Sequence, residues 1–97
     1  MSQSFGAVKG DGNIDNTGSG DWLVQKGPGS GNYTIDFAYP RPYVPVVVVG
    51  GYNTNTSPVG AKVLFSAYKV SVNSFCVIAM DSAGAGQDAD FSFIAVW

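Results

Sequence analysis

Apolar and polar residues alternate with a period of two along much of the chain. In the segment 33–37, Tyr, Ile and Phe alternate with Thr and Asp, and similar alternation recurs over 65–70, 75–79 and 91–97. Such a period places successive side chains on opposite faces of a β-strand. Thirteen Gly and five Pro leave no segment typical of a helix. We therefore predict one all-β domain over 1–97, an antiparallel β-sandwich of six or seven short strands that follows a Gly/Asn-rich arm and turn region at 1–20. The strands are expected near 5–8, 21–26, 32–38, 43–50, 61–71, 74–80 and 90–97.

Three of these strands are apolar on both faces. The segments 74–80 and 90–97 carry large apolar residues at odd and even positions alike, and Val46–Val49 has no polar position. A sandwich strand normally buries one face and exposes the other to water. The second face is covered either by a long loop or by neighbouring subunits, and we favour a symmetric homo-oligomer. The residues expected at the interface are Val47, Val49, Cys76, Ile78, Met80, Ile94 and Val96.

The size of the chain also favours assembly. Apolar burial contributes about 140 kcal/mol for a chain of this length, and ordering the chain opposes folding by about 145 kcal/mol. The lone Cys76 excludes an intramolecular disulfide. A subunit interface is therefore an attractive source of stability.

Composition excludes several kinds of chemistry. The chain has no His, its seven acidic residues are all Asp, and five Lys and Arg give a net charge of -2. The lack of His excludes a Ser-His-Asp triad and an imidazole metal site. The few basic residues argue against nucleic-acid binding. We therefore expect a protein that is not an enzyme and needs no cofactor.

No targeting signal is visible in the sequence. Residues 2–13 lack the basic and apolar regions of a secretory signal. The longest wholly apolar run, Val46–Val49, is far too short to span a bilayer. We expect cytoplasmic synthesis without membrane insertion; the final localisation is left open, and incorporation into a virion and export within a larger assembly are two alternatives.

Three segments together resemble a known family. They are the Tyr33-Thr34-Ile35-Asp36-Phe37-Ala38 strand with the later Pro45–Val49 run, the segment Lys62–Ser71, and the final Phe91–Trp97. This pattern is similar to the H-type lectin domain, and to small β domains of phage tail-fibre tips and bacterial collagen-like proteins. The resemblance covers most of 20–97. It implies a trimer-forming sandwich that recognises galactosides or other surface glycans, a role in keeping with cell adhesion.

The family's ligand positions fall on three residues of this chain. Its sugar-binding Arg corresponds to Lys62, which keeps the charge without the planar guanidinium. Its Trp-His pair corresponds to Ser82 and Ala83, so the aromatic platform of the family is absent here.

Two polar loops are candidates for ligand binding, and each has an alternative as an ordinary solvated turn. The loop 50–58 offers Tyr52, Asn53 and Asn55, residue types that bind sugars by stacking and by amide hydrogen bonds. The loop 81–90 is rich in Asp and Gly. The ligand residues that we predict are Tyr52, Asn53, Asn55, Lys62, Asp81, Gln87 and Asp88.

The segment Asp11–Asp21 has calcium-loop residues at alternate positions. However, Asn16 stands where an EF-hand requires Gly, and Trp22 where it requires Glu. An Asx-rich turn is the simpler interpretation, with calcium as the alternative. For the whole chain we predict a non-enzymatic, homotrimeric glycan-binding module; the alternative is a purely structural trimer, such as a virion decoration or appendage assembly protein.

Overall fold

The computed structural model describes residues 2–52 and 63–97, and within these ranges it contains strands and no helix. No segment in this part of the chain is therefore a helix that could span a membrane. The strands are β1 (Gln3–Val8), β2 (Ile14–Asn16), β3 (Trp22–Lys26), β4 (Asn32–Phe37), β5 (Val46–Gly51), β6 (Leu64–Tyr68), β7 (Ser74–Met80) and β8 (Phe91–Val96).

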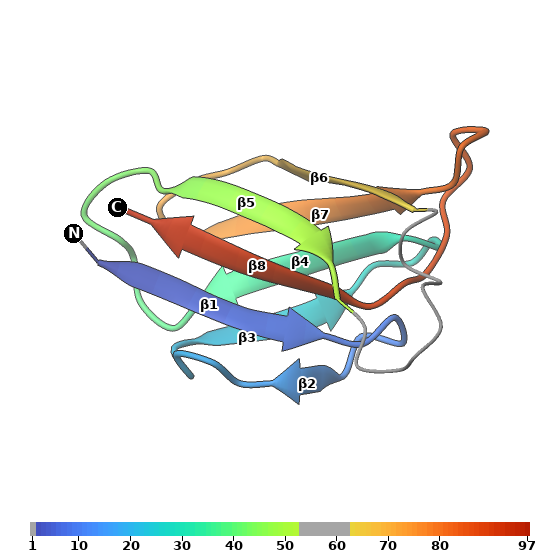
Figure 1. The fold of residues 1–97 in the computed structure, drawn as a ribbon. Coiled ribbons are helices and arrows are strands. Elements are labelled where there is room, and N and C mark those ends of the chain that lie inside the picture. The colour runs from blue at the N-terminus through green and yellow to red at the C-terminus, as the bar shows by residue number, and fades with distance from the viewer. Residues whose placement is uncertain (1, 53–62) are drawn as a thin grey trace.

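The strands form two antiparallel four-stranded sheets that pack face to face (Figure 1). Sheet A has the order β2-β1-β8-β5, and sheet B has the order β3-β4-β7-β6. This architecture confirms the predicted all-β sandwich. At one side of the sandwich the edge strands β5 and β6 lie next to each other.

The sequence prediction missed one strand and misplaced the ends of others. Strand β2 has only three residues and a single apolar one, so it carries no alternation, yet it pairs with β1. Residues 43–45 are loop, not strand, because Pro45 has no N–H for a ladder. Strand β6 ends at Tyr68, before Lys69 adopts a positive φ of 51°. The predicted start of this strand at 61–62 lies outside the described residues.

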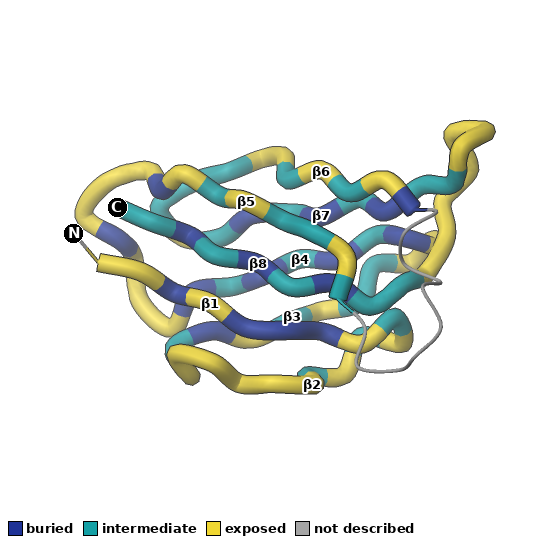
Figure 2. Tube along the Cα trace, viewed as in Figure 1, coloured by how far each residue is buried: buried dark blue, intermediate teal, exposed yellow. Residues whose placement is uncertain are grey.

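The core lies between the inner faces of the two sheets. Buried positions alternate with more exposed ones along β4, β7 and β8 (Figure 2). Aromatic rings join the sheets: Phe93 of β8 packs against Trp22 of β3 and Phe75 of β7, at centroid distances of 4.9 and 5.3 Å. Gly6 of β1 lacks a side chain, and the Trp22 ring occupies that space.

The outer face of sheet A is apolar over the three strands β1, β8 and β5. In the antiparallel ladder Phe5 lies opposite Ile94, which lies opposite Val48. In the next row Val96 lies opposite Val46. We call this surface face A, formed by Phe5, Val46, Val48, Ile94 and Val96.

The pairing of β5 with β8 corrects the prediction that two valines, Val47 and Val49, lie at the subunit interface. Val47 and Val49 pair with Ala95 and Phe93, and they pack against the core and not at an outer surface. The exposed valines of β5 are Val46 and Val48. An uninterrupted Val run does not reveal which alternate pair faces inward, and only the pairing with β8 decides it.

The outer face of sheet B is mostly apolar on β6 and β7, with Ser66 of β6 as a polar position opposite Ile78. Met80 lies opposite Leu64, and Cys76 lies opposite Tyr68, with Ile78 between them on β7. We call this surface face B, formed by Leu64, Tyr68, Cys76, Ile78 and Met80. The rest of the outer surface of sheet B is mostly polar, with Asn32, Thr34 and Asp36 on β4. The predicted outward positions of Cys76, Ile78 and Met80 therefore agree with the register.

Candidate functional site

The loops 9–13, 27–31 and 81–90 meet at one end of the sandwich, near the hydroxyl group of Tyr33. This hydroxyl donates to the Gly10 carbonyl oxygen at 2.8 Å and accepts the Ala89 N–H at 3.3 Å. The Gly10 N–H in turn donates to the Asp90 carboxylate at 2.7 Å. Burial raises the pKa of Tyr33 to about 12, although the Ala89 N–H opposes this, and the nearby Asp88 charge adds to it. Tyr33 therefore stays protonated and holds the loops together.

Asp88 links the loop 81–90 to the bend between β3 and β4. Its Oδ1 accepts the Gly31 N–H at 2.6 Å and lies 3.0 Å from Lys26 Nζ. The hydrogen bond from Gly31, followed by that from Lys26, lowers the pKa of the Asp88 carboxyl below its usual value. Gly31 has a φ of 79°, which favours glycine, and a side chain there would meet the Ala79 carbonyl. Asp88 is thus already used as a link within the fold.

The other predicted ligand residues of this loop have mainly local roles. Asp81 Oδ1 accepts the N–H groups of Ala83 and Ala85 at 2.9 and 3.0 Å, and this closes the turn. The Gln87 N–H donates to the Ala79 carbonyl at 3.0 Å, while the residue itself is exposed. Asn53, Asn55 and Lys62 lie outside the described residues.

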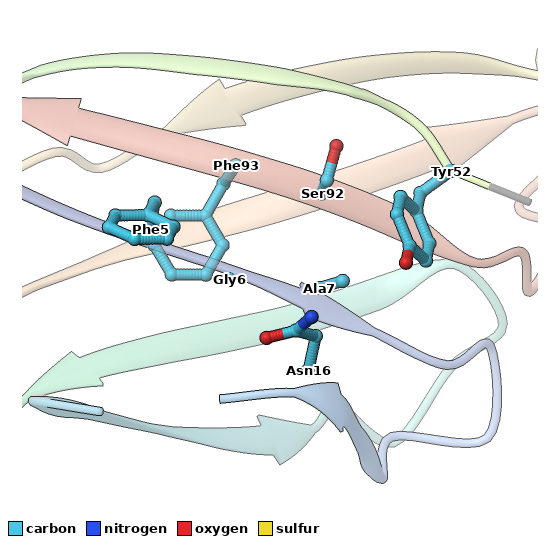
Figure 3. A pocket seen from close by; sticks show the side chains of 7 residues that line it. All are labelled: Phe5, Gly6, Ala7, Asn16, Tyr52, Ser92 and Phe93. Carbon is cyan, nitrogen blue, oxygen red and sulfur yellow. The ribbon is translucent and has the colours of Figure 1, made fainter. Parts of the chain in front are cut away.

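Tyr52 lines a pocket on the sheet A side of the molecule (Figure 3). The pocket has a volume of about 240 Å³. Its lining residues are Phe5, Gly6, Ala7, Asn16, Tyr52, Ser92 and Phe93. None of Asp81, Gln87 and Asp88 lines this pocket, although Tyr52 contacts the same loop: its N–H donates to the Asp90 carbonyl oxygen at 3.4 Å.

Sequence reasoning missed most of this pocket. Phe5 and Ser92 were assigned only to strands, and Asn16 to a turn. The pocket arises because the ladder places Ala7 opposite both Asn16 and Ser92. The pocket could have been predicted only from a strand at 14–16 and its register against β1.

A buried arginine was also missed, at the opposite end of the sandwich. The Arg41 side chain is fully buried, and its Nη2 donates to Ser4 Oγ at 2.7 Å and Asp21 Oδ2 at 2.9 Å. The guanidinium lies about 4.5 Å from the Phe37 and Trp97 ring centroids. Its Nε and Nη1 have no hydrogen-bond partner in the structure. The sequence feature that indicates this buried site is a single charged residue between two prolines, Pro40 and Pro42.

Asp21 keeps its charge beside Arg41. Burial disfavours the ionised carboxyl, but hydrogen bonds from Ser19 and Ser4 and the charge of Arg41 outweigh it, so the pKa of Asp21 lies below its usual value. Arg41 and Asp21 thereby tie the loop 38–45 to the start of β3 and to β1. We interpret this pair as structural.

The Asp-rich segment 11–21 forms Asx turns on either side of β2. Asp11 Oδ1 accepts the Asn13 N–H at 3.0 Å, and Asn16 Oδ1 accepts the Gly18 N–H at 2.8 Å. Residues 2–52 and 63–97 contain no cluster of three or more Asp or Cys side chains suited to a metal ion.

No family model, curated protein or solved structure matches the chain. The resemblance to the H-type lectin domain therefore stays a prediction.

Proposed function

We propose that this protein is a non-enzymatic β-sandwich binding module that functions as a homotrimer or a multiple of one. The observation that carries the proposal is the pair of apolar outer surfaces, faces A and B. Val46 and Val48 on face A are 70% and 61% exposed in the single chain, and Leu64 on face B is 65% exposed. Contiguous apolar surface of this kind typically marks an interaction site.

The placement of the two faces favours a ring over a dimer. An isologous dimer buries the same patch on both subunits, so one of the two faces would stay exposed. Faces A and B flank the neighbouring edge strands β5 and β6, so face A of one subunit can meet face B of the next. Such a head-to-tail contact forms a ring where the rotation between successive subunits closes, and the smallest such ring has three subunits.

The carboxylates support a binding role more than catalysis. A carboxylic acid that protonates a leaving group needs a raised pKa. The pKa of Asp88 is lowered instead, and Asp81 is occupied by turn N–H groups. The ligand that we propose is a glycan on a surface outside this protein, and the aromatic pocket beside Tyr52 supports it.

A purely structural trimer, such as a virion decoration or appendage assembly protein, is the second candidate. Faces A and B favour it equally, because they concern assembly and not a ligand. The two candidates differ only in what the pocket binds.

Sedimentation velocity at micromolar concentration tests the assembly. We expect a mass of three times the chain mass of 10.1 kDa, or a multiple of that. A stable monomer at these concentrations would refute the proposal. A dimer would refute the ring, since it needs only one of the two faces.

A further inference from the structure

The pocket beside Tyr52 is a short trough between two large side chains. Ala7, Ser92 and Gly50 lie opposite one another across β1, β8 and β5, so one row of the sheet surface carries only small side chains. Phe5, one row further along, forms one wall, and Tyr52 forms the other (Figure 3). A side chain added at Gly50 would meet open space, since nothing lies within 4 Å of that position.

The polar groups that the described residues place along this trough are uncharged. Ser92 contributes a hydroxyl group, Tyr52 a phenol and Asn16 a carboxamide. Asn16 Oδ1 already accepts the Gly18 N–H at 2.8 Å, so the side-chain nitrogen Nδ2 is the group left to donate. None of the seven described residues that line the pocket is charged.

We propose that this pocket binds one pyranose ring of a neutral hexose, an inference that deepens and rests on the proposed binding function. A pyranose has an apolar face that packs on an aromatic ring and hydroxyl groups that bond to amide and hydroxyl side chains. The volume of about 240 Å³ is smaller than that of sites for drug-sized ligands, which suits a single ring.

The lining also argues against other ligand classes. A uronic or sialic acid would bury its carboxylate without a cationic partner among the described lining residues, which is unfavourable. A purely apolar ligand would leave the Ser92, Tyr52 and Asn16 groups desolvated and unpaired. A neutral polyol with one apolar face avoids both costs.

The pocket borders the apolar rows of face A and shares Phe5 with them. Those rows run from Phe5 to Val48 and from Val96 to Val46, whereas Ser92 and Tyr52 lie towards the loop end. Ligand binding and assembly can therefore be altered separately, by substitutions at Ser92 and Tyr52 or at Val46 and Val48.

The test is a titration of the ¹⁵N-labelled full chain with methyl glycosides, in which the amide chemical shifts are measured at each step. The probes are methyl β-D-glucopyranoside, methyl β-D-galactopyranoside and methyl α-D-mannopyranoside, with methyl β-D-glucuronide as the charged counterpart. We expect at least one neutral glycoside to give saturable shifts of the Ala7 and Ser92 amides and of the Asn16 side-chain amide. The dissociation constant of the glucuronide should be higher by about tenfold or more.

Three variants make the test specific. Tyr52→Ala should weaken binding by about tenfold or more, because it removes one aromatic wall. Ser92→Leu should abolish binding by filling the trough. Tyr43→Ala is the matched control: Tyr43 is 71% exposed in the loop 38–45, away from the pocket, and its loss should leave binding unchanged.

The solution mass of every sample separates the possible failures. A correctly assembled protein that gives no saturable shift with any neutral glycoside overturns the pocket and leaves the assembly standing. Binding that survives both Tyr52→Ala and Ser92→Leu also overturns it. If Ser92→Leu lowers the mass, a neighbouring subunit occupies the pocket and the hexose proposal fails. A monomer that binds glycosides overturns the assembly alone.

Discussion

The double substitution Val46→Asp with Val48→Asp is expected to convert the assembled protein into monomers. Both side chains project from β5 on face A, opposite Val96 and Ile94, and both are largely exposed in the single chain. Burying a Val side chain contributes about 1.5–3 kcal/mol, so two lost valines cost about 3–6 kcal/mol per interface. This alone weakens association by about 10²- to 10⁴-fold, and two buried carboxylates would weaken it further.

The matched control places the same two charges on another edge strand. Leu23 and Gln25 are exposed alternate positions of β3, and Leu23 lies opposite the polar Asp36. Leu23→Asp with Gln25→Asp should leave the mass unchanged in sedimentation velocity. Circular dichroism and a cooperative thermal transition establish that each variant is folded. Retention of the native oligomeric mass by the folded Val46/Val48 variant would show that face A is not a subunit contact.

Asp21→Asn is expected to destabilise the fold far more than Arg41→Met. Without the Asp21 charge, the buried guanidinium of Arg41 has no counter-ion, and breaking such a pair costs about 3–5 kcal/mol. Arg41→Met instead removes the charge together with two nitrogens that lack partners. Asp21 then keeps its hydrogen bonds from Ser4 and Ser19. The free energy of unfolding should therefore change by no more than about 1 kcal/mol.

Urea unfolding at fixed protein concentration measures the free energy of unfolding of both variants. Because the folded-state pKa of Asp21 lies below the usual 3.8, its charge adds stability that is fully present above that pH. This contribution is lost as the pH falls from about 3.8 through the folded-state value. Arg41→Met should reduce that acid dependence. If Arg41→Met lowered the free energy of unfolding as much as Asp21→Asn does, the ion pair itself would supply the stability, which contradicts this prediction.

The sequence pattern predicted the parts of the fold in which polarity alternates. The inner faces of β4 and β7 follow directly from Tyr33, Ile35, Phe75 and Val77. The Val46–Val49 run has no alternation, so its inner face depends on the long-range pairing with β8. Strand β2 is too short to show any period and is defined by its pairing with β1.

The candidate site was harder to predict because it depends on two strand registers at once. Tyr52 was expected from its residue type, but Phe5, Asn16 and Ser92 join it only through the pairings of β1 with β2 and of β1 with β8. Asp88 looked like a ligand residue because it is a carboxylate in a polar loop. The structure shows that Gly31 and Lys26 already contact it.

Isotope-filtered nuclear Overhauser contacts between subunits test the central claim most directly. Labelled and unlabelled chains are refolded together, so that only contacts between different subunits are recorded. The ring of unlike faces predicts contacts from the Val46, Val48 and Ile94 methyl groups to Leu64, Ile78 and Met80 of the neighbouring copy. An assembled sample in which face A contacts only face A, or in which neither face shows contacts between subunits, would contradict it.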